Sequence, residues 1–158
     1  MVRRTLGAVT FALWAIAICS SLPAQTEKTI TIRMLDSRTG HLIVTSDFLV
    51  RINHEETAHG SWVKQNEDGS GRLILPEAAN ILSAQGKYDS GMTLYINCDS
   101  AKDKNSPVAR WYTVSDILTS GVVASNGCSK RTAAAKPGEF VFFVRERNWK
   151  EILDDYTN

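Results

Sequence analysis

The feature that most constrains this fold is a series of short segments in which every second residue is apolar. Two clear examples lie at residues 29–35 and 48–52. Alternation with a period of two puts one set of side chains on a buried face and the other on a solvent face, as in a β-strand. The apolar members are Ile30, Ile32, Met34, Phe48, Val50 and Ile52, and Arg51 is expected on the outward face.

A polar turn that leads into an apolar strand occupies residues 66–76. Gly69 and Gly71 offer the positive-φ positions that a tight reversal needs, and Leu73 to Leu75 then form the strand. Similar short strands lie on both sides of this corner, so the corner implies an all-β unit.

Similar short segments at residues 61–64, 81–84 and 92–98 extend the pattern. Residues 139–145 are apolar on both faces, which predicts a strand in the interior of a sheet. Short strands at such intervals, with turn signals between them, predict a mostly antiparallel β-sandwich.

Two short helices are expected in the last third of the chain. Thr113 can cap a helix from Val114 to Thr119 that Gly121 ends. Asn148 can cap a short C-terminal helix whose apolar residues recur at i, i+3, i+4 and i+7. These residues are Trp149, Ile152, Leu153 and Tyr156, and we expect them to pack on the sandwich with Trp149 in the core.

The first 24 residues have the layout of a secretory signal. Arg3 and Arg4 precede an apolar run at residues 6–18, which is shorter than the roughly 20 residues that span a bilayer. Cleavage after Ala24, or alternatively after Gln25, is expected. Cleavage after Ala24 would leave one domain, residues 25–158, with no membrane span and a periplasmic or extracellular location. Lipidation at Cys19 is an alternative, although Ile18 stands where such a site wants a small residue.

The mature chain would keep two cysteines, Cys98 and Cys128. An even number in an exported protein predicts one disulfide, and two buried free thiols are the alternative. Without the two leader arginines, 16 basic residues (18 − 2) face 17 acidic ones. This balance gives no reason to expect a nucleic-acid partner.

The residues also resemble a known family. The turn Asp36-Ser37-Arg38-Thr39-Gly40, the strand at residues 48–52 and the corner at residues 66–75 are similar to the carboxypeptidase regulatory-like domain, a transthyretin-like β-sandwich related in architecture to immunoglobulin domains. The resemblance covers residues 30–96, and the region from Trp111 onward resembles the tail of exported bacterial proteins. It implies an accessory or ligand-presenting module, with no catalytic residues and no cofactor.

Three positions depart from the family's pattern. Leu42 stands where the family often has proline, Asn66 where aspartate is common, and Gly71 where an apolar residue is frequent.

The segment from His54 to His59 is the candidate metal site. A zinc peptidase helix carries histidines at i and i+4 with a glutamate beside the first. Here the second histidine comes at i+5, about 140° away on a helix, so a solvated loop is the favoured interpretation. A loop site made of His54, Glu56 and His59 is the alternative, and it would make the protein a metal-dependent hydrolase.

Three aromatic residues, Trp111, Tyr112 and Tyr95, are the candidate ligand contacts. Tyr95 is expected opposite the core face of its strand, and Trp111 and Tyr112 follow a polar loop. Apolar groups outside the core suggest an interface with a protein or glycan partner. The sequence therefore predicts an exported, non-enzymatic accessory or binding module, with a glycan-binding module or the metal-dependent hydrolase as alternatives.

Overall fold

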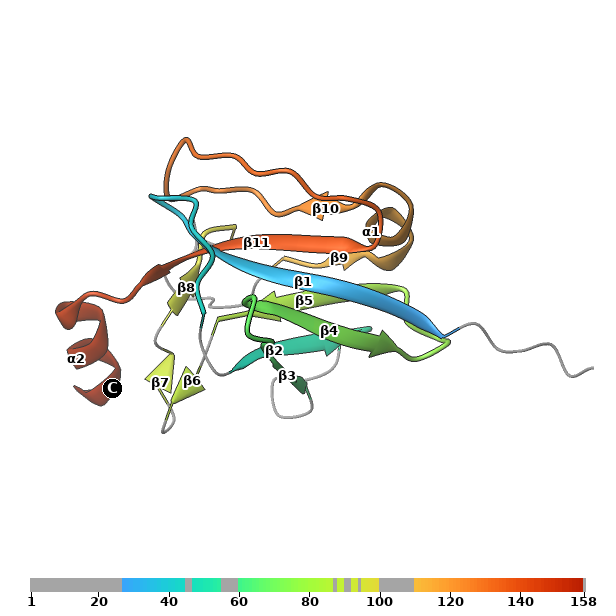
Figure 1. The fold of residues 1–158 in the computed structure, drawn as a ribbon. Coiled ribbons are helices and arrows are strands. Elements are labelled where there is room, and N and C mark those ends of the chain that lie inside the picture. Colours follow the sequence, from blue (N-terminus) through green and yellow to red (C-terminus); the bar gives the residue numbers. More distant parts are fainter. Residues whose placement is uncertain are drawn as a thin grey trace, which may run out of the picture.

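The computed structural model describes residues 27–44, 47–54, 60–86, 88–89, 92–93, 95–99 and 110–157, and two β-sheets dominate it (Figure 1). The predicted mostly-β sandwich with a short C-terminal helix is confirmed. The expected signal at residues 1–24, Cys19 and the candidate ligands Glu56 and His59 lie outside the described residues.

The first sheet, which we call sheet A, has the strand order β10-β11-β1-β4, and β8 also pairs with β11. Its strands are β1 (Lys28–Asp36), β4 (Ser70–Leu75), β8 (Tyr95–Asn97), β10 (Val122–Val123) and β11 (Glu139–Glu146). The parallel pairs are β1 with β11 and β10 with β11, while the other described pairs are antiparallel. β11, the last strand of the chain, therefore lies in the interior of sheet A, next to β1, the first strand.

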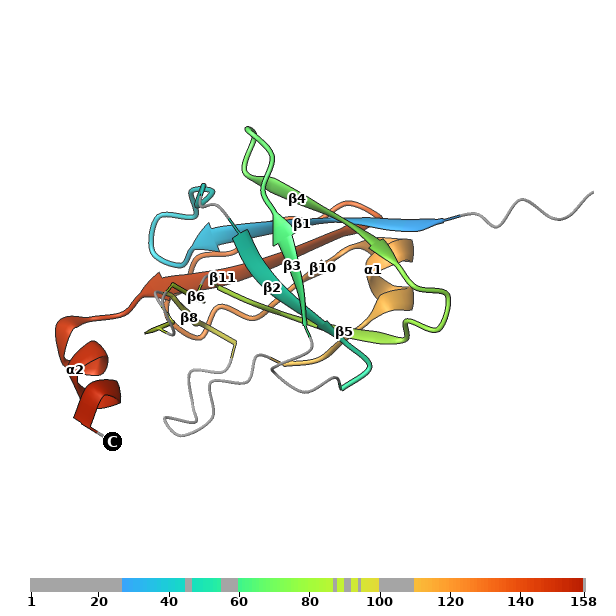
Figure 2. The ribbon, with the colours of Figure 1, turned by 90° about the horizontal axis from the view of Figure 1, so that it is seen from below.

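The second sheet, sheet B, has the order β3-β2-β5-β9 and crosses beneath sheet A (Figure 2). Its strands are β2 (Asp47–Ile52), β3 (Ser61–Lys64), β5 (Ile81–Gln85) and β9 (Tyr112–Thr113). A small hairpin joins β6 (Tyr88–Asp89) and β7 (Met92–Thr93), and the helices are α1 (Val114–Ser120) and α2 (Trp149–Thr157).

The main core fills the space between the sheets. The side chains of Ile30, Ile32 and Met34 are buried there, as the alternation predicts. The rings of Phe48 from sheet B and Phe142 from sheet A meet edge to face, 5.9 Å between centroids. Aromatic pairs in this geometry add about 0.5–1.5 kcal/mol beyond the area that they bury.

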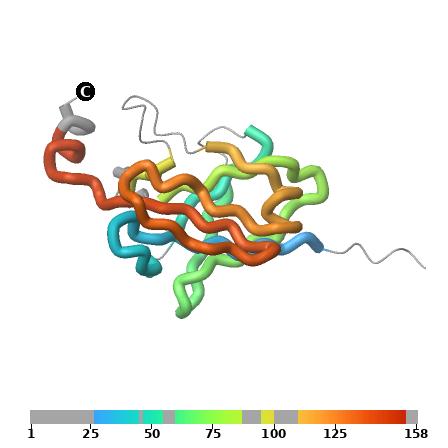
Figure 3. The backbone as a smooth tube through the Cα atoms, turned by 90° about the horizontal axis from the view of Figure 1, so that it is seen from above, coloured from blue at the N-terminus to red at the C-terminus, as the bar shows by residue number. Residues whose placement is uncertain are grey.

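A second apolar cluster lies on the outer face of sheet A. Leu35, Cys98, Val141 and Phe143 are buried there beneath the chain that runs from β10 to β11. In the view from above, this orange segment runs alongside β11 (Figure 3), and the amide of Ala124 donates to the Val141 carbonyl at 2.8 Å. Both faces of β11 are therefore covered, which confirms the interior position expected from its continuous apolar sequence.

The turn before β4 has the expected positive φ at Gly69, whereas Gly71 does not have a positive φ. Asp68 Oδ1 accepts hydrogen bonds from the Ser70 amide at 2.9 Å and hydroxyl at 2.6 Å, and Gly69 has φ of +73°. Gly71 belongs to β4 instead. A Cβ at this position would lie 2.4 Å from Phe48 Cζ, so the glycine is needed for a close approach rather than for a turn.

Arg51 is buried, although the alternation predicts an outward, solvated side chain. It is 3% exposed, and its Nη2 donates to Gln85 Oε1 at 3.2 Å. Leu49 and Ser83 on the same face are also buried. The backbone at Gly60 lies close over this face, because a Cβ there would be 2.7 Å from Leu49 Cδ1. The outer face of sheet B is therefore covered around Arg51, which the alternation cannot reveal.

Helix α1 has nearly the predicted limits, and Gly121 ends it with φ of +76°. Thr113 occupies the N-cap position without a side-chain cap bond, and the Val114 amide instead donates to the Asn80 carbonyl at 2.8 Å. No helix within the described ranges is both long and apolar enough to cross a membrane.

The expectation that Trp149 of α2 lies in the core is wrong, and Leu153 of the predicted stripe is also exposed. The side chain of Tyr156 lies outside the described ones. The Trp149 side chain is 75% exposed, and the helix projects beyond the end of β11 (Figures 1 and 2). The Asn148 cap is confirmed, since its Oδ1 accepts from the Glu151 amide at 3.0 Å. Glu151 also binds the Arg145 guanidinium at 2.8 and 2.5 Å. These bonds fix the start of the helix at the strand end, away from the core.

Candidate functional site

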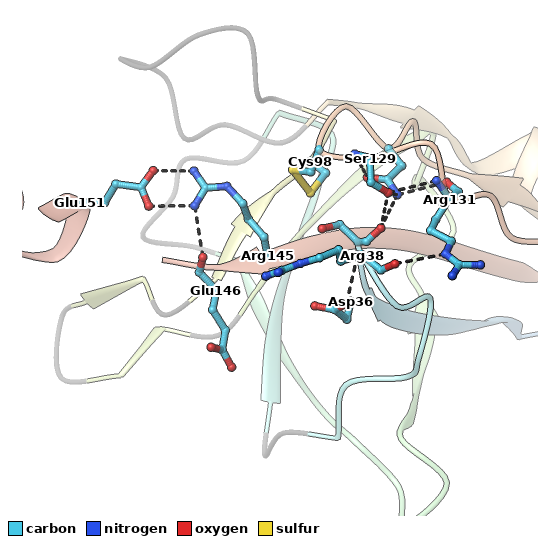
Figure 4. Close-up of a disulfide and its surroundings, with 11 residues drawn as sticks. Asp36, Arg38, Cys98, Ser129, Arg131, Arg145, Glu146 and Glu151 are labelled. Carbon is cyan, nitrogen blue, oxygen red and sulfur yellow. Dashed lines mark hydrogen bonds and ion pairs between the residues drawn. A yellow bond between two sulfur atoms is a disulfide. The ribbon is translucent and has the colours of Figure 1, made fainter. Parts of the chain in front are cut away.

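The disulfide joins the end of β8 to the segment that covers sheet A (Figure 4). The Cα atoms of Cys98 and Cys128 are 5.2 Å apart, which confirms the predicted pair. The Cys98 amide donates to the Phe143 carbonyl, and the Gly127 amide donates to the Cys98 carbonyl, both at 2.9 Å. The disulfide therefore fixes the backbone of the adjacent Asp99 against sheet A.

Asp99 and Tyr112 form a partly buried hydrogen-bonded pair. Tyr112 donates its hydroxyl to Asp99 Oδ2 at 2.9 Å, and the Arg110 amide donates to the same oxygen at 3.3 Å. The second oxygen, Oδ1, is buried and has no hydrogen-bond partner among the described residues, and Asp99 is 7% exposed. Burial raises the pKa of Asp99, against the opposing effect of these two donors. The pair holds residues 110–112 in place, which makes Asp99 a positioning residue.

Burial beside a carboxylate raises the pKa of Tyr112 far above its ordinary value. The ring of Tyr112 packs on Phe140 of the main core, 4.9 Å between centroids. Tyr112 is therefore a neutral hydrogen-bond donor that is half-buried against the main core.

Trp111, the next residue along the chain, contacts His54 instead. Their ring centroids are 4.6 Å apart with the planes inclined at 53°. Trp111 is half-buried and His54 is exposed, so the pair reaches the surface beside β9, an edge strand of sheet B. We call His54, Trp111, Tyr112 and Asp99 together the β9 edge.

The backbone around Asn53 explains the placement of His54. Both residues have positive φ, +51° and +61°, a conformation in which asparagine and histidine are enriched among non-glycine residues. The Asn53 side chain donates to the Ala78 carbonyl at 2.7 Å and accepts from the Asn80 amide at 2.9 Å. These bonds hold the tight turn after β2 and direct the imidazole towards Trp111.

Tyr95 lies on the inner side of its strand, contrary to the expected orientation. It packs, partly buried, against the main core, and a Cβ at Gly86 would lie 2.6 Å from Tyr95 Cβ. Asn97 on the same side donates to the Ala84 carbonyl of β5 at 2.7 Å. The alternation within β8 is as predicted, but the assignment of its core face was wrong. The structure therefore does not bring Tyr95 to the β9 edge.

Of the candidate metal ligands, only His54 lies in the described part of the chain. Among the described residues, no group of three or more histidine, cysteine, aspartate or glutamate side chains could hold a metal ion. A metal site that uses Glu56 and His59 stays a prediction.

A polar groove on the outer face of sheet A has no counterpart in the sequence predictions. It has a volume of about 370 Å³, and Arg33 of β1, Arg72 of β4 and Glu139 of β11 line it. The outward positions of these residues follow from alternation. Their meeting depends on the pairing register of three strands, which the sequence does not give.

Comparison of the chain with protein-family models, with curated proteins and with solved structures finds no match. The resemblance to the carboxypeptidase regulatory-like domain therefore stays a prediction.

Proposed function

We propose that this chain is an exported, non-enzymatic binding module that recognises its ligand at the β9 edge. The disulfide supports export, because such bonds form and persist in oxidising compartments. The leader-like sequence of residues 1–24 supports the same conclusion. The family resemblance supports a binding role outside the cytoplasm.

The contact between His54 and Trp111 is the observation that carries the proposal. Two rings from distant parts of the chain meet at the surface beside an edge strand, outside both apolar clusters. The strain of two consecutive positive-φ residues is retained at this position, and such strain concentrates at binding sites. The partly buried Asp99–Tyr112 hydrogen bond holds the neighbouring backbone, so the indole is presented from a fixed support.

A glycan is the ligand class that this arrangement favours. A half-buried indole offers an apolar face, and the exposed imidazole beside it offers a hydrogen-bonding edge. Ligand sites commonly combine aromatic surface with a few placed polar groups. A protein partner that inserts one side chain against the same rings would be the other ligand of a binding module.

Tryptophan fluorescence of the purified protein, titrated with a panel of neutral and charged polysaccharides, tests the glycan assignment. Saturable quenching by one class of polysaccharide is expected. A flat response across the panel would exclude the glycan. Retention from an envelope fraction on immobilised protein then tests for a protein partner. The absence of saturable binding in both assays would contradict the proposed function.

A further inference from the structure

Charged and hydroxyl-bearing side chains from neighbouring strands line the polar groove on sheet A. Thr31 and Arg33 project from β1, and Ser70 and Arg72 project from β4. The antiparallel register places Thr31 opposite Arg72 and Arg33 opposite Ser70, while the parallel register places Glu139 on the other side of Thr31. One row across three strands therefore reads Arg72, Thr31, Glu139.

The two arginines are in different situations. Arg33 is held in place, because its Nη2 donates to Glu139 Oε2 at 3.2 Å and to the Ala134 carbonyl at 2.9 Å. Arg72 is exposed, and no described residue forms an ion pair or hydrogen bond with its guanidinium. In the groove, the charge of Arg33 is therefore paired with that of Glu139. The guanidinium of Arg72 has no partner among the described residues, so its N–H groups are available to a ligand.

The turn before β4 forms the opposite wall. Asn66 and Asp68 line the groove there, and Asp68 uses Oδ1 to bind Ser70. The hydrogen bonds from Ser70 lower the pKa of Asp68, so this group is a carboxylate at neutral pH. Its Oδ2 and Glu139 Oε1 have no protein donor among the described residues, which leaves both able to accept from hydroxyl groups.

These groups select for a sugar unit that combines one carboxylate with several hydroxyls. A guanidinium matches the planar geometry of a carboxylate and binds it through two parallel hydrogen bonds. Asp68 and Glu139 repel a doubly charged phosphate more strongly than a singly charged carboxylate, and both accept hydrogen bonds from neutral hydroxyls. A volume of about 370 Å³ lies in the range of small-ligand sites.

We propose that this groove is a second binding site, which takes a hydroxylated carboxylate of the acidic-sugar class with its carboxylate on Arg72. The site goes beyond the proposed function, since it lies on sheet A whereas the β9 edge belongs to sheet B. The carboxylate lies against Arg72 and Thr31, and the ring hydroxyls donate to Asp68 and Glu139.

Calorimetric titration of the purified protein with trigalacturonate tests this assignment, with maltotriose as the neutral trimer. Trigalacturonate is expected to bind and maltotriose to bind much more weakly. Arg72→Gln should weaken trigalacturonate binding by about 10- to 100-fold, the range for loss of a charge-assisted hydrogen bond. Arg72→Lys keeps the positive charge but cannot form the two parallel hydrogen bonds of a guanidinium. Its loss of affinity should therefore be smaller than that of Arg72→Gln.

Arg38→Gln is the matched control, because Arg38 is an exposed arginine outside the groove. It should leave the affinity unchanged, and so should Trp111→Ala, which separates this site from the β9 edge. Thr31→Val, which keeps strand propensity and removes one hydroxyl, gives a second test if Arg72 variants fold poorly, with a smaller loss expected.

Three results would overturn the proposal: no binding of trigalacturonate, equal affinity of Arg72→Gln and the wild type, or inorganic phosphate that binds as tightly as the trimer. Loss of trigalacturonate binding in Trp111→Ala alone would also overturn it, because the sugar would then occupy the β9 edge.

Discussion

Removal of the disulfide should destabilise the protein by roughly 3–4 kcal/mol. Cys98 and Cys128 are separated by 30 residues, and the chain-entropy model gives this value for a loop of that length. Cys98 is 1% exposed within the second apolar cluster, so its substitution also removes buried contacts. For a domain of this size, the loss corresponds to a fall in Tm of roughly 10–15 °C.

Equilibrium urea unfolding of the wild type and of the double variant Cys98→Ala/Cys128→Ala measures the change. The wild type under reductant provides a second comparison without any substitution, and both should unfold at lower urea concentration. A difference below about 1 kcal/mol would refute the reasoning, given the range observed for native disulfides. So would two reactive thiols in the unreduced, denatured wild-type protein.

Three further predictions concern the core, the β9 edge and α2. Gly71→Val should lower the free energy of unfolding by about 1–3 kcal/mol, because the new side chain overlaps Phe48, and an unchanged urea midpoint would contradict this. Burial raises the pKa of Asp99, so the wild type should lose stability as pH rises from about 4, the unfolded value, through the raised value. Asp99→Asn cannot ionise, so its stability relative to the wild type should increase over this window, and a constant difference would be the contrary result. Hydrogen bonding by Arg145 lowers the pKa of Glu151 to about 2, so the anchor of α2 should be lost as pH falls from 4.5 towards 2, measured by amide hydrogen exchange in α2. Glu151→Gln should show fast exchange in α2 already at neutral pH, and slow exchange there would contradict the role of this ion pair.

Local sequence patterns predicted the strands well, because a strand that is buried on one face has an apolar residue at every second position. The inner residues of β1 and the two-sided apolar sequence of β11 lie where their patterns place them. The Asn148 cap and the glycine that ends α1 were likewise predicted from single positions. These features depend on neighbours within a few residues.

The errors have a common physical cause. Alternation shows which residues share a face, but it does not show what covers that face. Arg51 is buried because the chain near Gly60 lies over sheet B, and Tyr95 faces inward because a second apolar cluster occupies the other side of sheet A. The apolar stripe of α2 was correctly read as helical, but the Trp149 side chain is exposed.

The candidate sites depend on pairing between distant segments. Trp111 and Tyr112 were identified from their position after a polar loop, whereas the contact between Trp111 and His54 requires the turn after β2 and the pairing of β9 with β5. The groove around Arg72 requires the parallel pairing of β1 with β11. The local sequence does not show which residues of two distant strands pair with each other.

The most direct test of the binding proposal compares three tryptophan variants for affinity to the ligand found in the panel or envelope assay. Trp62 and Trp149 are 54% and 75% exposed and lie outside the β9 edge, so Trp62→Ala and Trp149→Ala are matched controls. Trp111→Ala should lower the affinity at least about tenfold, as truncation of a central aromatic contact does, while both controls keep it. Equal affinity of Trp111→Ala and the wild type, with the fold intact by circular dichroism, would contradict the assignment of the β9 edge as the binding site.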